Sequence, residues 1–282
     1  MMKAWGWNRA TRVNRALVVS VTAFDPGVDL CARSGAKRDA KRLHKVLSKL
    51  GFGVDLHMDP TAEEIYQLFK EASENAAGDR FVGVLSSHGK EGVVFGADGA
   101  PVRLKQIFSL FGSPAMAGKT KLFFIQACRG GMLDSGVEVE TDSVDGVVEE
   151  EDSLSHYLSI PVDTAVMFAT PPGYSAFMHL EGSVFIQTLC RLLEEDGGRG
   201  LEVTQLMTRI NYWVAYHFQA RGGKLAGMKE MPCFVTRLTH QAFPFADADT
   251  TQPGLTKDAT LQSPTTMVPN DFSSRPRKHY IS

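Results

Sequence analysis

Short apolar runs alternate with amphipathic helical segments along most of this sequence, and this alternation limits the folds open to the chain. The apolar runs are typical of buried strands, and each helical segment carries its apolar residues on one face. We predict strands at 17–21, 54–56, 81–86, 121–126, 165–169 and 233–238, and helices at 36–50, 183–195 and 202–219, with further helices opening at the capping box Thr61-Ala62-Glu63-Glu64 and near 104–111. This order indicates an α/β fold in which helices cover both faces of a mostly parallel sheet.

Composition and charge exclude several classes of protein. The 282 residues carry 30 Lys and Arg against 32 Asp and Glu, so no basic field points to a nucleic-acid partner. The longest apolar runs are too short to span a bilayer, which argues against a membrane partner, and no apolar signal core follows the N-terminus. The four cysteines form no C-x-x-C pair, so we expect reduced thiols in a cytoplasmic protein, with no metal and no cofactor.

Three segments depart from the alternating pattern. Residues 1–15 are basic and contain no acid, which favours a short mobile arm over the alternative of a transit peptide. Residues 138–152 hold eight acidic side chains and no Lys or Arg, so we expect a mobile surface linker there. Residues 246–282 are rich in Thr, Ser and Pro and show no periodicity, which predicts a disordered tail.

Two predicted strands end on residues suited to nucleophilic catalysis. Strand 81–86 leads into Ser87-His88-Gly89, and strand 121–126 leads into Ala127-Cys128. Ligands bind beyond the carboxyl ends of parallel strands, so we expect His88 and Cys128 to meet at one edge of the sheet. An imidazole favours the reactive thiolate and can protonate a leaving group, and the N–H groups of Gly89 and Cys128 are candidates for an oxyanion hole. The alternative is that Cys128 is a structural thiol and His88 an ordinary loop residue.

The string Gln126-Ala127-Cys128-Arg129-Gly130, with His88 forty residues upstream, resembles the signature of the caspases, in which that separation is about 50. Similar strings extend over roughly 16–245: Arg33-Ser34-Gly35, a histidine loop at 85–92, a helix string at 185–190 and a strand string at 231–235. The resemblance implies the caspase-like (caspase-hemoglobinase) fold with a six-stranded sheet. It also implies a large-subunit region at 16–142 and a small-subunit region at 143–245.

The same resemblance implies an Asp-directed cysteine endopeptidase acting in apoptosis or related proteolytic signalling. Cys128 would attack the peptide carbonyl and His88 would transfer the proton. Arg33 and Gln126 would hold the P1 carboxylate of a protein or peptide substrate, because guanidinium groups bind carboxylates in a bidentate manner. No long recruitment domain precedes the matching region, so we expect an effector-type member. The resemblance also implies a homodimer of processed large and small subunits, in which strand 234–238 pairs with its twofold mate.

The chain departs from the caspase pattern at the third position expected to bind the P1 carboxylate. Caspases carry an Arg shortly after a Pro-Gly-Tyr turn, but here no Arg occurs between Gly173 and Arg191, and Met178 takes its place by position. We expect Ser175, Phe177 and Met178 on this segment to contact substrate. Two hypotheses remain open: an active peptidase with a relaxed or altered P1 preference, or a catalytically weak homologue that regulates active caspases by pairing or scaffolding.

Asp142, inside the acidic segment, resembles the site at which caspases are cut between their large and small subunits. An exposed mobile loop suits proteolysis, and the alternative is an acidic loop whose only role is to interact with solvent.

A metacaspase-like peptidase with a basic P1 preference would need acidic residues where this chain has Arg33 and Gln126. A purely structural interaction module would not depend on Cys128, so replacing that residue separates the enzyme from the scaffold.

Overall fold

The computed structural model describes residues 13–75, 77–136, 160–195, 199–221 and 225–246. Contacts within the chain define one unit, Met1–Asp247, that contains all of these residues, and a second, Ala248–Ser282, that contains none of them. Most of the predicted basic arm, the acidic segment with Asp142, and the predicted tail beyond residue 246 lie outside the described residues.

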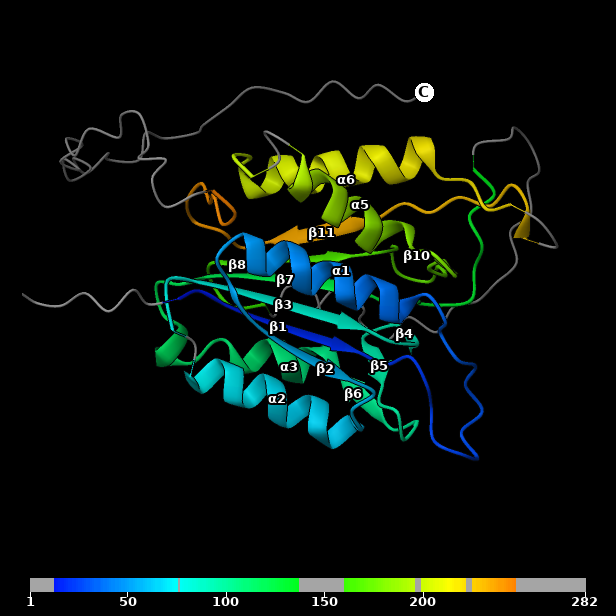
Figure 1. Ribbon diagram of the computed structural model, residues 1–282, viewed down its shortest axis with the longest axis horizontal. Helices are drawn as coiled ribbons and strands as arrows, with labels where there is room; N and C mark the ends of the chain where they lie inside the picture. The colour runs from blue at the N-terminus through cyan, green and yellow to red at the C-terminus, as the bar shows by residue number, and fades with distance from the viewer. Residues whose placement is uncertain (1–12, 76, 137–159, 196–198, 222–224, 247–282) are drawn as a thin grey trace, which may run out of the picture. The chain divides into compact units, whose positions relative to one another are not determined.

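Six strands form one sheet at the centre of the first unit, in the order β11-β8-β7-β3-β1-β2 (Figure 1). Their bounds are β1 Arg15–Ser20, β2 Gly53–Met58, β3 Arg80–Ser86, β7 Thr120–Gln126, β8 Thr164–Phe168 and β11 Cys233–Thr236. Every neighbouring pair is parallel except β11 and β8. β7 and β8 are buried along their whole length, as strands covered on both faces should be. The predicted α/β fold with a mostly parallel six-stranded sheet is confirmed.

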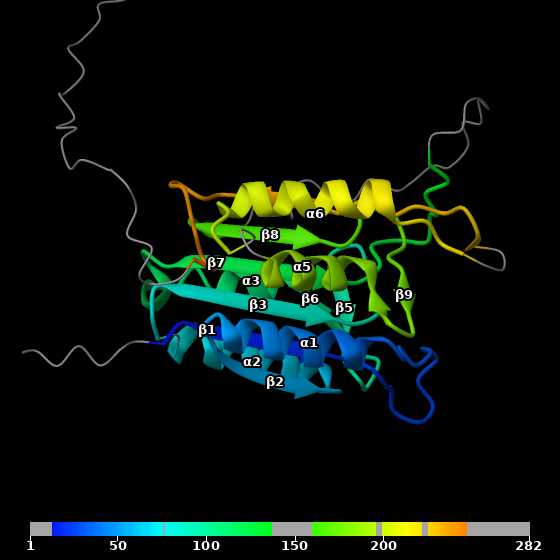
Figure 2. The ribbon, with the colours of Figure 1, turned by 45° about the horizontal axis from the view of Figure 1, so that its top comes forward.

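Helices cover both faces of the sheet. α1 (Ala36–Lys49), α5 (Val184–Glu194) and α6 (Val203–His217) lie side by side across one face, as Figure 2 shows. α2 (Ala62–Asn75) and α3 (Leu104–Leu110) cover the other face. Alternate residues of each strand supply the two cores: Val18 packs in the core with α1 and α5, whereas Val19 packs with α2 and α3.

The helix ends follow signals that are present in the sequence. Thr61 and Glu64 form the predicted capping box, with the Thr61 N–H donating to Glu64 Oε2 at 2.8 Å and the Glu64 N–H donating to Thr61 Oγ1 at 3.3 Å. α1 stops just before Gly51, whose φ of +79° is favourable only for a residue without a Cβ.

The sequence did not predict five short strands and a 3-10 turn. β4 (Gly89–Lys90), β5 (Val93–Phe95) and β6 (Pro101–Arg103) form a small antiparallel sheet, while β9 (Met178–His179) and β10 (Gly182–Ser183) form a hairpin. The turn η1 spans Pro114–Met116. Strands of two or three residues are too short to show an alternating pattern, so periodicity does not detect them. Both sets of strands nevertheless lie next to the candidate site.

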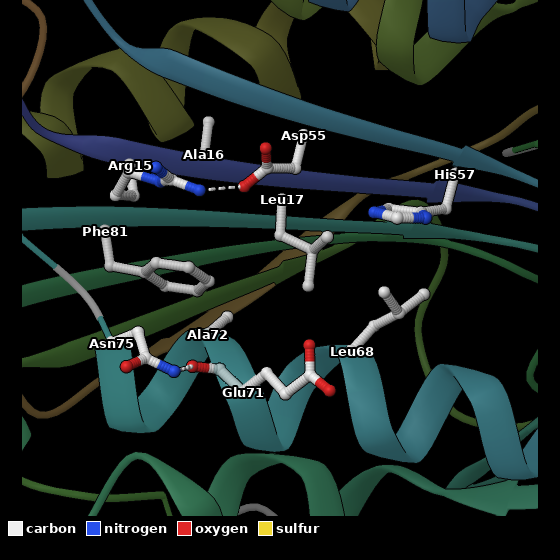
Figure 3. Close-up of a pocket in the computed structure, with 10 residues that line it drawn as sticks. All are labelled: Arg15, Ala16, Leu17, Asp55, His57, Leu68, Glu71, Ala72, Asn75 and Phe81. Atoms are coloured by element: carbon white, nitrogen blue, oxygen red, sulfur yellow. Dashed lines mark hydrogen bonds and ion pairs between the residues drawn. The ribbon is translucent and has the colours of Figure 1, made fainter.

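A cavity of about 320 Å³ lies between β1, β2 and α2 (Figure 3). Arg15 and Asp55 form an ion pair on its wall, and Leu17 and Phe81 supply apolar surface. No cysteine lines it, so it lacks the nucleophile that the sequence singled out. None of the described helices combines the length and apolar character needed to cross a membrane.

Candidate active site

A cavity of about 360 Å³ lies beyond the carboxyl ends of β3 and β7. These two strands are parallel neighbours, and their last residues, Ser86 and Gln126, lie opposite each other. His88 and Cys128 follow these strand ends, and both line the cavity together with Arg33, Gln126 and Met178. The structure thus brings a thiol, an imidazole and a guanidinium from three separate parts of the chain to one place, at the edge where α/β sheets bind ligands.

The imidazole of His88 is held by a backbone carbonyl. His88 Nε2 lies 2.8 Å from the Cys31 carbonyl oxygen, and the ring stacks on Phe24 with a centroid distance of 5.4 Å. A carbonyl only accepts hydrogen bonds, so Nε2 carries the proton and Nδ1 is left as the acceptor. Burial, with a smaller contribution from the charge of Arg33, lowers the pKa of His88 below its usual value against the opposing effect of the Cys31 carbonyl. A neutral imidazole of this kind is suited to accept a proton.

A second thiol occupies the same cavity. Cys31 Sγ is exposed and lies 3.6 Å from His88 Nε2. No local sequence pattern indicates this contact, because Cys31 belongs to the long loop between β1 and α1 and is 57 positions away from His88.

The sulfur of Cys128 contacts the segment that carries Met178. The Ala176 N–H donates to Cys128 Sγ at 3.4 Å, and Sγ lies 3.6 Å from the Ala176 carbonyl oxygen. Gly89 packs against the same residue: a Cβ built on Gly89 would lie 2.9 Å from the Cys128 carbonyl oxygen and 2.7 Å from that of Val93. Only glycine fits at that position without a shift of the backbone. The predicted oxyanion-hole residues are therefore neighbours.

Arg33 is the positively charged group of the cavity. Its side chain is almost fully buried, with 6% exposed, and its guanidinium donates to the Val21 carbonyl at 2.6 Å and to Ser86 Oγ at 2.9 Å. Burial lowers its pKa to about 10 although the charge of Asp39 opposes the shift, so Arg33 remains a cation at neutral pH. Gln126 Oε1 is also buried and has no hydrogen-bond partner among the described residues.

The segment after the Pro-Gly-Tyr turn contributes alternate residues to the cavity. Ala176 and Met178 line it, whereas Ser175 and Phe177 do not. Ser175 Oγ instead donates to the Gly130 carbonyl at 3.2 Å, and the Phe177 ring packs on another ring at 5.3 Å, that of Phe218. Successive residues of an extended segment face opposite sides, which accounts for this alternation, and contact of Ser175 and Phe177 with substrate stays a prediction.

The hairpin that carries Met178 is fastened to α1 by a buried carboxylate. Asp39 accepts hydrogen bonds from the Ser183 N–H at 2.9 Å, from Ser183 Oγ at 2.8 Å and from Gln187 Nε2 at 2.7 Å. Burial raises the pKa of Asp39 and these donors oppose the shift. The sequence signal for this role is an acid on the apolar face of the predicted helix 36–50, where Asp39 lies among the buried residues of α1.

Arg129 has a structural role within the string that resembles the caspase signature. Its guanidinium pairs with Glu91 Oε1 at 3.1 Å, donates to the Thr170 carbonyl at 3.2 Å and stacks on the Phe168 ring at 4.2 Å. These contacts tie the loop after β7 to β8 and to the loop between β4 and β5, and so fix the backbone that presents Cys128.

An α/β sheet with a thiol and an imidazole at neighbouring strand ends defines a class of cysteine peptidase-like proteins. The model of the caspase domain family matches residues 13–243, so this chain belongs to the caspase family. It is 32% identical over 240 residues to caspase-7 of Gallus gallus, covering 82% of this chain and 77% of the relative. It is also 32% identical over 235 residues to caspase-3 of Bos taurus, covering 80% of this chain and 82% of that protein.

The fold is similar to a solved structure of the same family. The crystal structure of caspase-1 from Spodoptera frugiperda matches with a TM-score of 0.71 and 26% identity, covering 86% of this chain and 92% of the other. The family places the chain in the caspase class of cysteine peptidases.

Proposed function

We propose that this protein hydrolyses peptide bonds in other proteins after Asp, with a relaxed P1 preference. The observation that carries the proposal is the shared cavity, in which Cys128 and His88 lie with the buried cation of Arg33. Reduced thiols fit a location in the cytoplasm. The family resemblance supports a role in apoptosis or related proteolytic signalling.

The chemistry follows from the groups present. Cys128 Sγ attacks the carbonyl carbon of the substrate, and the N–H groups of Gly89 and Cys128 bind the resulting oxyanion. The C–N bond then breaks, and His88 delivers to the leaving amine the proton that it took from the thiol. Water, activated by His88, hydrolyses the thioester and returns the thiol. The Cys31 carbonyl keeps the imidazole oriented throughout these steps.

A substrate library that varies the P1 residue tests the proposal. We expect purified, processed protein to turn over peptides with Asp at P1 most rapidly, because Arg33 offers a charged partner inside a buried site. The preference for Asp over other P1 residues should be weaker than in a caspase whose P1 pocket contains two Arg side chains. A complete lack of turnover for every P1 residue would reject the peptidase.

The second candidate is a catalytically weak homologue that pairs with active relatives, and Met178 favours it. Arg33 is the only Arg or Lys among the residues that line the described cavity, so a substrate carboxylate meets one permanently charged group there, and His179 is the other lining residue that can compensate for the missing Arg. β11 lies at the edge of the sheet, and of the described strands only β8 pairs with it. We propose that this edge supports a dimer of this chain or a pair with a relative.

Processing between the two regions is proposed at Asp142. We expect Asp142→Ala to slow the appearance of two fragments by roughly tenfold or more, because Asp-directed cleavage requires that carboxylate in the substrate. Immunoblotting of the maturing protein measures the fragments, and Asp145→Ala provides the matched control on the same segment. Maturation of Asp142→Ala at the wild-type rate would place the cleavage elsewhere.

A further inference from the structure

Glu230 carries a buried carboxyl group, lies three residues before the start of β11 and takes no part in the catalytic steps above. Its side chain is only 1% exposed. Oε2 accepts a hydrogen bond from the Phe177 N–H at 2.5 Å, and Oε1 has no partner among the described residues. A buried polar atom without a partner is rare in folded proteins, and this one lies against the segment that borders the active-site cavity.

The bond from Phe177 fastens a residue between two that form the cavity wall. Ala176 and Met178 line the cavity, and the Ala176 N–H donates to Cys128 Sγ. Glu230 and Phe218, which contact Phe177, do not line the cavity. Glu230 therefore acts on the wall from behind, and a shift of Phe177 moves its two neighbours together with it.

No charged side chain of the described residues pairs with the Glu230 carboxyl group. The Lys229 ammonium donates to the carbonyls of Ala215 and Phe218, and Asp134 Oδ1 accepts from the Gly136 N–H. Burial raises the pKa of Glu230 to about 8, opposed only by the Phe177 N–H. The group is thus neutral at pH 7 and loses its proton to solvent in mildly alkaline buffer.

We propose that protonated Glu230 is a positioning residue that holds the cavity wall at 176–178 in its peptide-binding form, and that its ionisation releases this wall and weakens peptide binding. Ionisation strengthens the bond from the Phe177 N–H, but this single donor does not replace the hydration that a carboxylate loses on burial. Water therefore enters or the side chain moves toward solvent, and either change shifts the wall behind Phe177. This inference rests on the peptide-binding part of the proposed function, because it concerns the same cavity.

Binding of a fluorescent peptide to Cys128→Ala tests the inference without requiring turnover. The peptide carries Asp at P1, and anisotropy gives its Kd from pH 6.5 to 9.0, a range that stays below the pKa of Arg33. We expect Kd to rise roughly threefold or more between pH 7 and 9 in Cys128→Ala, and to stay within about twofold in Cys128→Ala with Glu230→Gln. The Gln side chain still accepts the Phe177 N–H but has no proton to lose. Glu74→Gln, on the exposed face of α2, is the matched control and should keep the rise.

Thermal unfolding of the same proteins measures the titration of Glu230 independently of peptide binding and shows whether each variant folds. The pKa of Glu230 is higher in the folded than in the unfolded protein. The folded protein therefore loses stability as the pH rises from the pKa of the unfolded state to that of the folded state. The Tm of the Glu230 protein relative to Glu230→Gln should therefore fall until about pH 8 and then level off.

An equal rise of Kd in both backgrounds would overturn the inference, as would a Tm difference that does not change with pH. Peptide binding that follows this pattern without any cleavage by the intact protein would reject the proposed peptidase alone and leave the role of Glu230 standing. Absence of any peptide binding would reject both.

Discussion

Replacement of Cys128 by alanine is expected to lower kcat/KM for the preferred peptide by roughly four orders of magnitude or more. The variant retains the cavity, Arg33 and the His88–Cys31 contact, but it removes the sulfur that forms the covalent intermediate. Ala replaces a partly buried thiol whose contacts are both with the backbone of Ala176, so the fold should persist. Initial rates with a fluorogenic peptide, together with Tm values, measure the two effects separately.

The other thiol of the cavity provides the matched control. Cys31→Ser leaves the backbone carbonyl that holds His88, and we expect turnover within about tenfold of the wild type. A loss in Cys31→Ser as large as that in Cys128→Ala would move the nucleophile to Cys31 or make both thiols necessary. Unchanged cellular output with Cys128→Ala would instead favour the scaffold hypothesis.

Introducing a second guanidinium, with Met178→Arg, is expected to raise kcat/KM for peptides with Asp at P1 by roughly 30-fold or more. Met178 lines the cavity with Arg33 and Gln126, and a charge pair in a desolvated site contributes about 2–5 kcal/mol. Repulsion between the two guanidinium groups is offset by the substrate carboxylate and by the nearby charge of Asp39. Parallel assays of peptides that differ only in Asp or Asn at P1 measure the gain.

An uncharged replacement at the same position isolates the effect of the charge. Met178→Leu should keep the Asp-to-Asn ratio of the wild type within about threefold, because it alters only the shape of the wall. No change in the ratio with Met178→Arg would show that this side chain does not reach the P1 carboxylate, and that the corresponding position lies elsewhere on the segment.

The main elements of the fold were predictable because their signals are local. The run 121–126 is apolar enough to be buried on both faces, and the structure places β7 at Thr120–Gln126 in the middle of the sheet. Thr61 and Glu64 indicated the start of α2, because the capping box that they form needs only four consecutive residues. The hairpin of β9 and β10 escaped prediction because two-residue strands depend on Asp39, more than a hundred positions away, for their place.

The candidate site was predictable to a more limited extent. Strand ends indicated His88 and Cys128, and the family resemblance indicated Arg33 and Gln126, all of which the structure places on one cavity. Ser175 and Phe177 do not line that cavity, because the twist of the segment decides which of its alternate residues face inward, and their contact with substrate stays a prediction. Cys31 and Glu230 gave no signal, because neither has a neighbour in sequence that explains its position.

The amino-acid sequence alone indicated the six strands of the main sheet and the long helices, and which two of those strands end in a thiol and an imidazole, because periodicity and end signals act over a few residues. Only the tertiary structure decided that the Cys31 carbonyl orients His88, that Arg33 is buried beside the cavity, and that Glu230 supports its wall from behind. Those relations join residues from separate loops, and burial and charge environment exist only once the chain has packed.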